Sequence, residues 1–164
     1  MKHLAALALI AAAGGAAAED DAFVTFQALR PELAQEMAEA ALIACRDAGY
    51  QVGVTVVDRF GQPQVFLRDR FAGAHVYETS RRKAWTAVSF RTNTTDLAVA
   101  TGPGTNSSAI RHLSEALPLG GGLMVMEGGG SIVAGIGVSG APDPDLDDTC
   151  AEAGIAAIED RIAF

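Results

Sequence analysis

Four short β-rich runs, arranged as two hairpins, constrain the fold of this chain more than any other feature. Small and apolar residues alternate over 52–57, and a second run follows at 64–68 after the turn Asp58-Arg59-Phe60-Gly61. The other pair, 123–126 and 131–138, is joined by Gly128-Gly129-Gly130. Two β-rich runs joined by a short glycine-containing loop predict a hairpin. The strands are therefore expected to pair mostly antiparallel.

Apolar residues at helical spacing surround these hairpins and complete the expected order of elements. The expected helices cover 25–48 with Thr25 as cap, 77–90, short pieces at 92–100 and 107–116, and a last helix capped by Asp147 or Asp148. The resulting order, α-β-β-α-(α)-β-β-α, predicts an α/β protein of the α+β type, with one mostly antiparallel sheet flanked by helices in a profilin-like layout. No internal repeat or linker interrupts residues 19–164, so we expect a single domain there.

The first 18 residues have the pattern of a secretory signal peptide. Lys2 precedes an apolar run at 4–13, small residues fill 16–18, and the acidic residues 19–21 follow. An apolar run of about ten residues is too short to span a bilayer, which needs about 20. We therefore expect cleavage near Ala18 and a periplasmic or secreted protein without membrane insertion.

The charge balance excludes two classes of partner. The chain has 12 Lys and Arg against 20 Asp and Glu, a formal net charge of −8, and loss of Lys2 with the signal peptide makes the balance −9. Nucleic acids and anionic membrane surfaces are bound by clustered Lys and Arg. We therefore expect neither as a partner, whereas a small anionic ligand held by a few local cations remains compatible.

Cys45 and Cys150 are the two cysteines of the chain and lie 105 positions apart. Their spacing fits neither a zinc site nor a C-x-x-C motif. In an oxidising compartment an even pair favours a disulfide, and closing a loop of this length is worth about 4–5 kcal/mol in the chain-entropy model. Two buried free thiols are the alternative.

Candidate ligand-binding residues cluster between the first hairpin and the helix that follows it. Arg68 ends the second strand, and Lys83 lies in the apolar stretch Lys83-Ala84-Trp85-Thr86-Ala87, where its ammonium could meet a ligand carboxylate. His75 and Tyr77 precede Lys83 and offer side chains that could coordinate a metal or haem iron. His112, in the short helix at 107–116, is a weaker candidate for the same role.

Glycines alternate in Ala134-Gly135-Ile136-Gly137-Val138-Ser139-Gly140, within the last expected strand. Such spacing indicates that something approaches the backbone closely there. A ligand, another chain and a helix packed on the sheet are all compatible with it.

These stretches together resemble the GlcG/HbpS haem-binding family, which includes the C-terminal domain of PduO-type proteins. The matching residues are Val54-Thr55-Val56-Val57-Asp58 with Gly61, Arg68, Lys83 to Ala87, Gly135 to Gly140, and Asp145 to Gly154. The resemblance implies a compact α/β domain, a homo-oligomer and, for some members, haem as the bound group.

Three hypotheses follow. In the first, the exported protein binds haem for sequestration or sensing, with Arg68 and Lys83 pairing with the propionates and His75 ligating the iron. In the second, it acts on a small hydroxy- or oxo-acid, with Arg68 and Lys83 clamping the carboxylate and Asp58 as base. In the third, it is a structural subunit without a small ligand. No nucleophile–base pair is evident in the sequence, which favours a binding protein over an enzyme.

Overall fold

The computed structural model describes residues 22–163, so the expected signal peptide lies outside the described residues. Its elements follow the expected order; the short helical piece expected at 107–116 is a 3-10 helix, and a short terminal helix is added. They are α1 (Pro31–Asp47), β1 (Gly53–Asp58), β2 (Pro63–Arg68), α2 (Val76–Phe90), α3 (Thr94–Ala100), η1 (Ser108–His112), β3 (Gly122–Met126), β4 (Ile132–Ser139), α4 (Pro144–Ala156) and α5 (Glu159–Ile162).

The four strands form one antiparallel sheet in the order β2-β1-β4-β3. Both expected hairpins are present, and they join through β1 and β4, where Val54 pairs with Val138 and Val56 with Ile136. The expected α+β architecture with a mostly antiparallel sheet is therefore confirmed.

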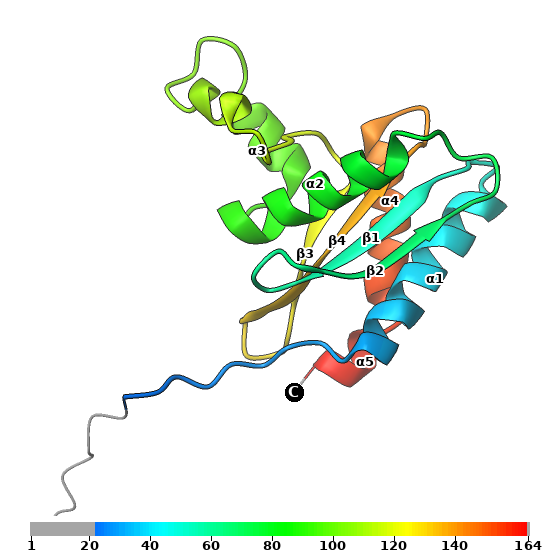
Figure 1. Ribbon diagram of the computed structural model, residues 1–164, viewed down its shortest axis with the longest axis vertical. Helices are drawn as coiled ribbons and strands as arrows, with labels where there is room; N and C mark the ends of the chain where they lie inside the picture. Colours follow the sequence, from blue (N-terminus) through cyan, green and yellow to red (C-terminus); the bar gives the residue numbers. More distant parts are fainter. Residues whose placement is uncertain (1–21, 164) are drawn as a thin grey trace, which may run out of the picture.

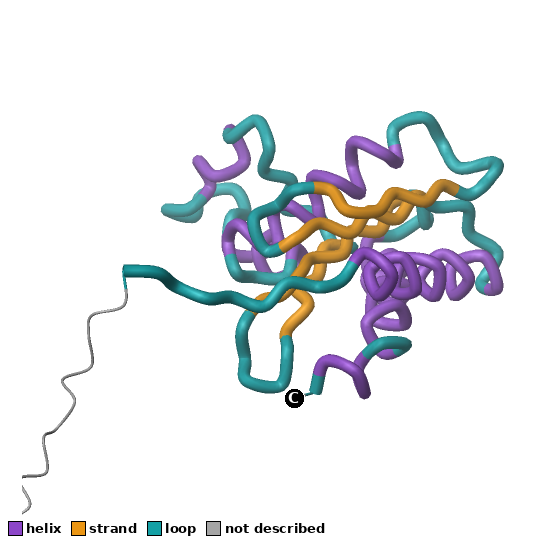
Figure 2. Tube along the Cα trace, turned by 60° about the horizontal axis from the view of Figure 1, so that its bottom comes forward, coloured by secondary structure: helices purple, strands orange, loops and turns teal. Residues whose placement is uncertain are grey.

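Helices cover both faces of the sheet (Figures 1 and 2). Helices α1 and α4 lie side by side on one face, where Val54, Val56, Ile136 and Val138 meet Met37 and its neighbours in the larger apolar core. Helix α2 crosses the opposite face and packs on β4, β1 and β3. Because α2 makes few contacts with β2, the outer part of that face is left partly open.

The alternating glycines of β4 lie under α2. A Cβ atom on Gly137 would lie 2.0 Å from the carbonyl oxygen of Ser80, and one on Gly135 would lie 3.0 Å from that of Ala84. Of the three explanations compatible with the sequence, helix-on-sheet packing is therefore the one that the structure supports.

Two helix starts differ from the expectation. Helix α1 begins at Pro31 rather than at Thr25, because proline favours the first helical position and keeps the preceding Arg30 extended. Helix α4 is capped by Asp143, whose carboxylate accepts the amide of Asp145, and not by Asp147 or Asp148. Both expected caps therefore were wrong.

Candidate functional site

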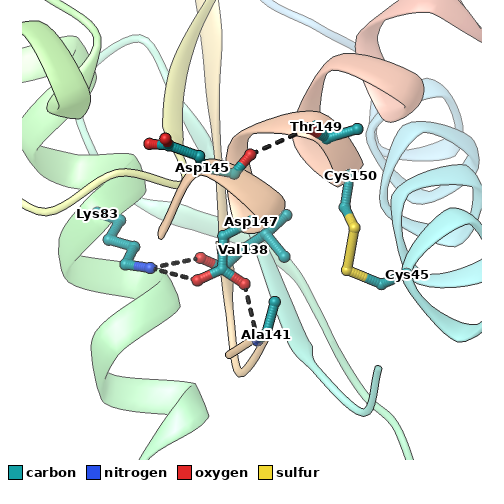
Figure 3. Close-up of a disulfide and its surroundings, with 8 residues drawn as sticks. All are labelled: Cys45, Lys83, Val138, Ala141, Asp145, Asp147, Thr149 and Cys150. Atoms are coloured by element: carbon teal, nitrogen blue, oxygen red, sulfur yellow. Dashed lines mark hydrogen bonds and ion pairs between the residues drawn. A yellow bond between two sulfur atoms is a disulfide. The ribbon is translucent and has the colours of Figure 1, made fainter. Parts of the chain in front are cut away.

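Lys83 points from α2 into the protein interior and pairs with a carboxylate of the chain itself (Figure 3). Its Nζ donates to Asp147 Oδ2 at 2.8 Å and to the carbonyl oxygen of Val138 at 2.9 Å, and its side chain is only 1% exposed. Burial raises the pKa of Asp147, while the Lys83 ammonium opposes that rise. Lys83 was expected to meet the carboxylate of a ligand, whereas its ammonium is paired with Asp147, a carboxylate of the chain itself in α4.

Asp58, the expected base of the hydroxy-acid hypothesis, is engaged in the β1–β2 turn. Its Oδ1 accepts the amides of Phe60 at 2.8 Å and Gln62 at 2.9 Å. This is the usual use of an aspartate at a turn, where the side chain satisfies backbone donors. The geometry thus gives Asp58 a structural role.

Arg68, His75 and Tyr77 all lie toward the end of the sheet where α2 begins. Arg68 follows Phe66 by two residues in β2, so both side chains lie on the face that α2 covers. The ring of Tyr77 meets that of Phe66 edge-on at 4.7 Å and is 46% exposed. Arg68 and His75 are also exposed, and His75 directly precedes α2.

His112, the weaker candidate, lies apart from these residues and is exposed in η1. The guanidinium of its neighbour Arg111 donates to carbonyl oxygens of α3 and of the C-cap of α3.

The remaining cations of α2 have partners within the chain. Arg81 donates to Glu115 at 2.7 Å and to Glu78 at 3.2 Å. Arg82 donates to the carbonyl oxygens of Glu115 and Ala116. These two arginines hold the segment before β3 against α2 and are less available to a ligand.

A cleft of about 640 Å³ lies at the opposite end of α2, and it was missed from the sequence. Its lining includes Arg59 and Phe60 of the β1–β2 turn, Trp85 and Arg91 of α2 and its C-cap, and Met124 and Met126 of β3. A volume of this size is in the range of small-molecule and cofactor sites. Two dipeptides are the sequence signal that could have indicated this cleft. Arg59 precedes Phe60 in the β1–β2 turn, and Arg91 follows Phe90 at the end of α2.

A second cleft, of about 630 Å³, lies between the segment before α1 and helix α5. Its lining contains Glu32, Glu36 and Glu127, and an ion pair joins Glu36 to Arg161. Arg30 also lines the cleft, but the three carboxylates outnumber the two arginines, one of which is paired with Glu36, so the cleft is a poor host for an anion.

Two further findings concern residues 22–163. No group of three or more His, Cys, Asp or Glu side chains there could hold a metal ion. No helix in that part of the chain is long and apolar enough to cross a membrane.

Comparison with known proteins gives the family context of this geometry. A family model described as haem-degrading, HbpS-like protein matches residues 29–156. A double mutant of HbpS from Streptomyces reticuli is 39% identical, with 90% of this chain and 98% of that chain covered and a TM-score of 0.79. No curated protein matches the chain.

Two more distant structures share the fold. The PduOC:heme complex is 28% identical, with 80% of this chain and 95% of that one covered and a TM-score of 0.74. The protein ORFY from Klebsiella pneumoniae is 25% identical, with 84% and 94% covered and a TM-score of 0.79.

Proposed function

Because this chain belongs to the HbpS-like family of haem-degrading proteins, we propose that it binds haem. The family match over residues 29–156 carries the proposal, and a neighbour of the same fold is a haem complex. Haem would supply an iron centre whose reactivity depends on its axial ligands and on the polarity around it.

The residues at hand fit such a group. A haem site needs apolar walls for the macrocycle, cations for the two propionates and a donor for the iron. Arg68, His75 and Tyr77 at one end of α2 combine a cation with two possible iron ligands. The cleft at the other end combines two arginines with aromatic and methionine side chains.

Titration of the protein beginning at Glu19 with ferric haem tests the proposal. We expect a saturable, shifted Soret band at low-micromolar haem, with one haem bound per chain. The same protein unfolded in urea is the control for non-specific association. A Soret spectrum identical to that of free haem throughout the titration would refute haem binding.

We propose further that the protein sequesters or senses haem rather than acting on a small hydroxy- or oxo-acid. The support is that Asp58, the expected base for an acid substrate, and Lys83, an expected clamp for its carboxylate, are engaged in internal hydrogen bonds. The Soret band of the complex should then persist for hours in air with ascorbate. Progressive loss of the band would instead indicate haem degradation.

Export is the last part of the proposal. The support is the Lys2 start, the apolar run at 4–13 and the small residues before the acidic 19–21. In a bacterial host producing the full chain, we expect the periplasmic fraction to contain a protein whose intact mass begins at Glu19. An uncleaved protein confined to the cytoplasm would contradict export.

A further inference from the structure

The geometry points to the cleft at the C-terminal end of α2 as the haem site, with Arg59 and Arg91 pairing with the propionates. This inference rests on the proposed haem binding and names the residues that carry it. It differs from the sequence expectation, which placed Arg68, His75 and Tyr77 at the other end of the helix.

The first argument is local charge. The chain has a formal net charge of −8, yet none of the eleven residues that line the cleft is acidic and two are arginines. Within residues 22–163, neither Arg59 nor Arg91 has a carboxylate partner, whereas Arg46, Arg81 and Arg161 each have one. A cationic, acid-free cleft in an acidic protein selects an anionic ligand.

The second argument is the setting of Arg59. Its guanidinium carbon lies 5.2 Å from the ring centroid of Phe26 and 5.7 Å from that of Phe60. Stacking of this kind uses the faces of the guanidinium plane, while its N–H groups lie at the edges. The aromatic rings therefore hold the cation in place and leave its donors for a carboxylate.

The third argument is the backbone at Arg91. This residue caps α2 in the left-handed conformation, with φ 52° and ψ 45°, and every other described residue with positive φ is a glycine. Glycine is the usual residue at such a helix end because a Cβ atom is disfavoured there. An arginine at this position bears a backbone cost that glycine would avoid, and its side chain reaches the cleft.

The walls suit a flat macrocycle that contains iron. Trp85 and Val88 of α2 and Ile132 of β4 supply apolar lining, and Ile132 packs against the small apolar cluster that contains Val88. Met124 and Met126 lie two residues apart in β3 and both belong to the lining. Methionine thioethers are among the axial ligands that proteins give to haem iron.

Trp85 is the single tryptophan of the chain, so its fluorescence reports on the cleft directly. The experiment titrates the protein beginning at Glu19 with ferric haem and, separately, with iron-free protoporphyrin IX, which keeps both propionates. We expect both to quench Trp85, with dissociation constants within about tenfold of each other. A charge-assisted hydrogen bond is worth enough that Arg59→Gln and Arg91→Gly should each weaken binding about tenfold or more.

Arg91→Gly separates binding from folding, because it removes the guanidinium while relieving the left-handed backbone. Its melting temperature should equal or exceed that of the parent, even as its affinity falls. Arg91→Lys keeps a charge and should recover part of the affinity. Arg70→Gln is the matched control, since Arg70 is 72% exposed and lies outside the cleft.

The outcomes separate the site from the function. Ferric haem that binds equally well to the parent, Arg59→Gln and Arg91→Gly would overturn the site and leave haem binding intact. Loss of binding in Arg68→Gln or His75→Ala instead would move the site to the other end of α2. Binding of haem without binding of the iron-free porphyrin would overturn the role of the arginines. Absence of haem binding by the parent protein would refute the proposed function and the site together.

Discussion

At the scale of single residues, the buried ion pair of Lys83 and Asp147 is the one whose loss should lower the free energy of unfolding most. Both side chains are almost fully buried, and the lysine also satisfies the carbonyl oxygen of Val138. Lys83→Met leaves Asp147 buried without its cation, and removal of one partner of such a pair costs about 3–5 kcal/mol. Urea unfolding of the disulfide-intact protein at neutral pH measures this loss.

The matched control is the double variant Lys83→Met with Asp147→Asn. In the parent, the backbone N–H of Ala141 donates to Asp147 Oδ1 at 3.0 Å. The asparagine side chain keeps an oxygen that can accept this hydrogen bond but carries no charge. We expect the double variant to recover at least half of the lost free energy of unfolding. A Lys83→Met protein within about 1 kcal/mol of the parent would show that the pair does not stabilise the fold.

Asp69 should make stability depend on pH in the acidic range. Its hydrogen bond with Arg46 Nε, at 2.8 Å, holds the pKa of Asp69 below its ordinary value. The unfolded state therefore binds the proton more readily, so this stabilisation is complete above about pH 4–5, near the unfolded pKa of about 3.9. It is lost as the pH falls through the lower pKa of the folded state.

Asp69→Asn should thus lower the free energy of unfolding at neutral pH, and its deficit relative to the parent should shrink below about pH 4. Urea titrations at several pH values measure the deficit. Asp160→Asn, at an exposed position in α5, is the control for the loss of one negative charge. A deficit that stays constant down to pH 2 would argue against the Arg46 pair as its cause.

At the scale of elements, the Cys45–Cys150 disulfide joins α1 to α4 on one face of the sheet (Figure 3). The bridge closes a loop with a sequence separation of 105, for which the chain-entropy model gives about 4–5 kcal/mol. We expect Cys45→Ala with Cys150→Ala to lower the free energy of unfolding by about this amount. Dithiothreitol should have the same effect on the parent and none on the double variant.

The elements show which parts of the fold are predictable from sequence. The two hairpins and the disulfide pair were predictable because turn glycines and a single cysteine pair are local or unambiguous signals. The starts of α1 and α4 were not, since Thr25 and Asp147 looked like caps while Pro31 and Asp143–Pro144 set the true starts. A proline at the first helical position was the stronger signal in both cases.

The candidate site was less predictable than the fold because it depends on contacts between distant segments. Lys83 and Asp147 are 64 positions apart, and no local pattern pairs them. The cleft combines the β1–β2 turn, the end of α2 and strand β3, so its residues converge only once the sheet order is known. The placement of Arg68 at the end of β2 and of Tyr77 in the first turn of α2 did follow from sequence, because hairpin register and helix start are set locally.

At the scale of the whole molecule, apolar side chains on the α3–η1 region remain exposed. Val99 is 78% exposed, Leu113 is 52% exposed, and Leu119 follows them before β3. Figure 1 shows this region projecting from the body of the sheet and its helices. Exposed apolar groups that no part of the same domain covers are typical of interaction surfaces.

The family resemblance implies a homo-oligomer, so we propose that a second copy of the chain covers this surface. Light scattering of the protein beginning at Glu19 should then give a mass that is a multiple of the monomer mass at micromolar concentration. Val99→Asp should shift the mass toward the monomer, because a charge at a buried contact costs more than at a solvated one. Ser107→Asp, an exposed polar position in the same region, should leave the mass unchanged. A parent protein that is monomeric at all concentrations would contradict the assembly, and a Val99→Asp protein with unchanged mass would place the contact on another surface.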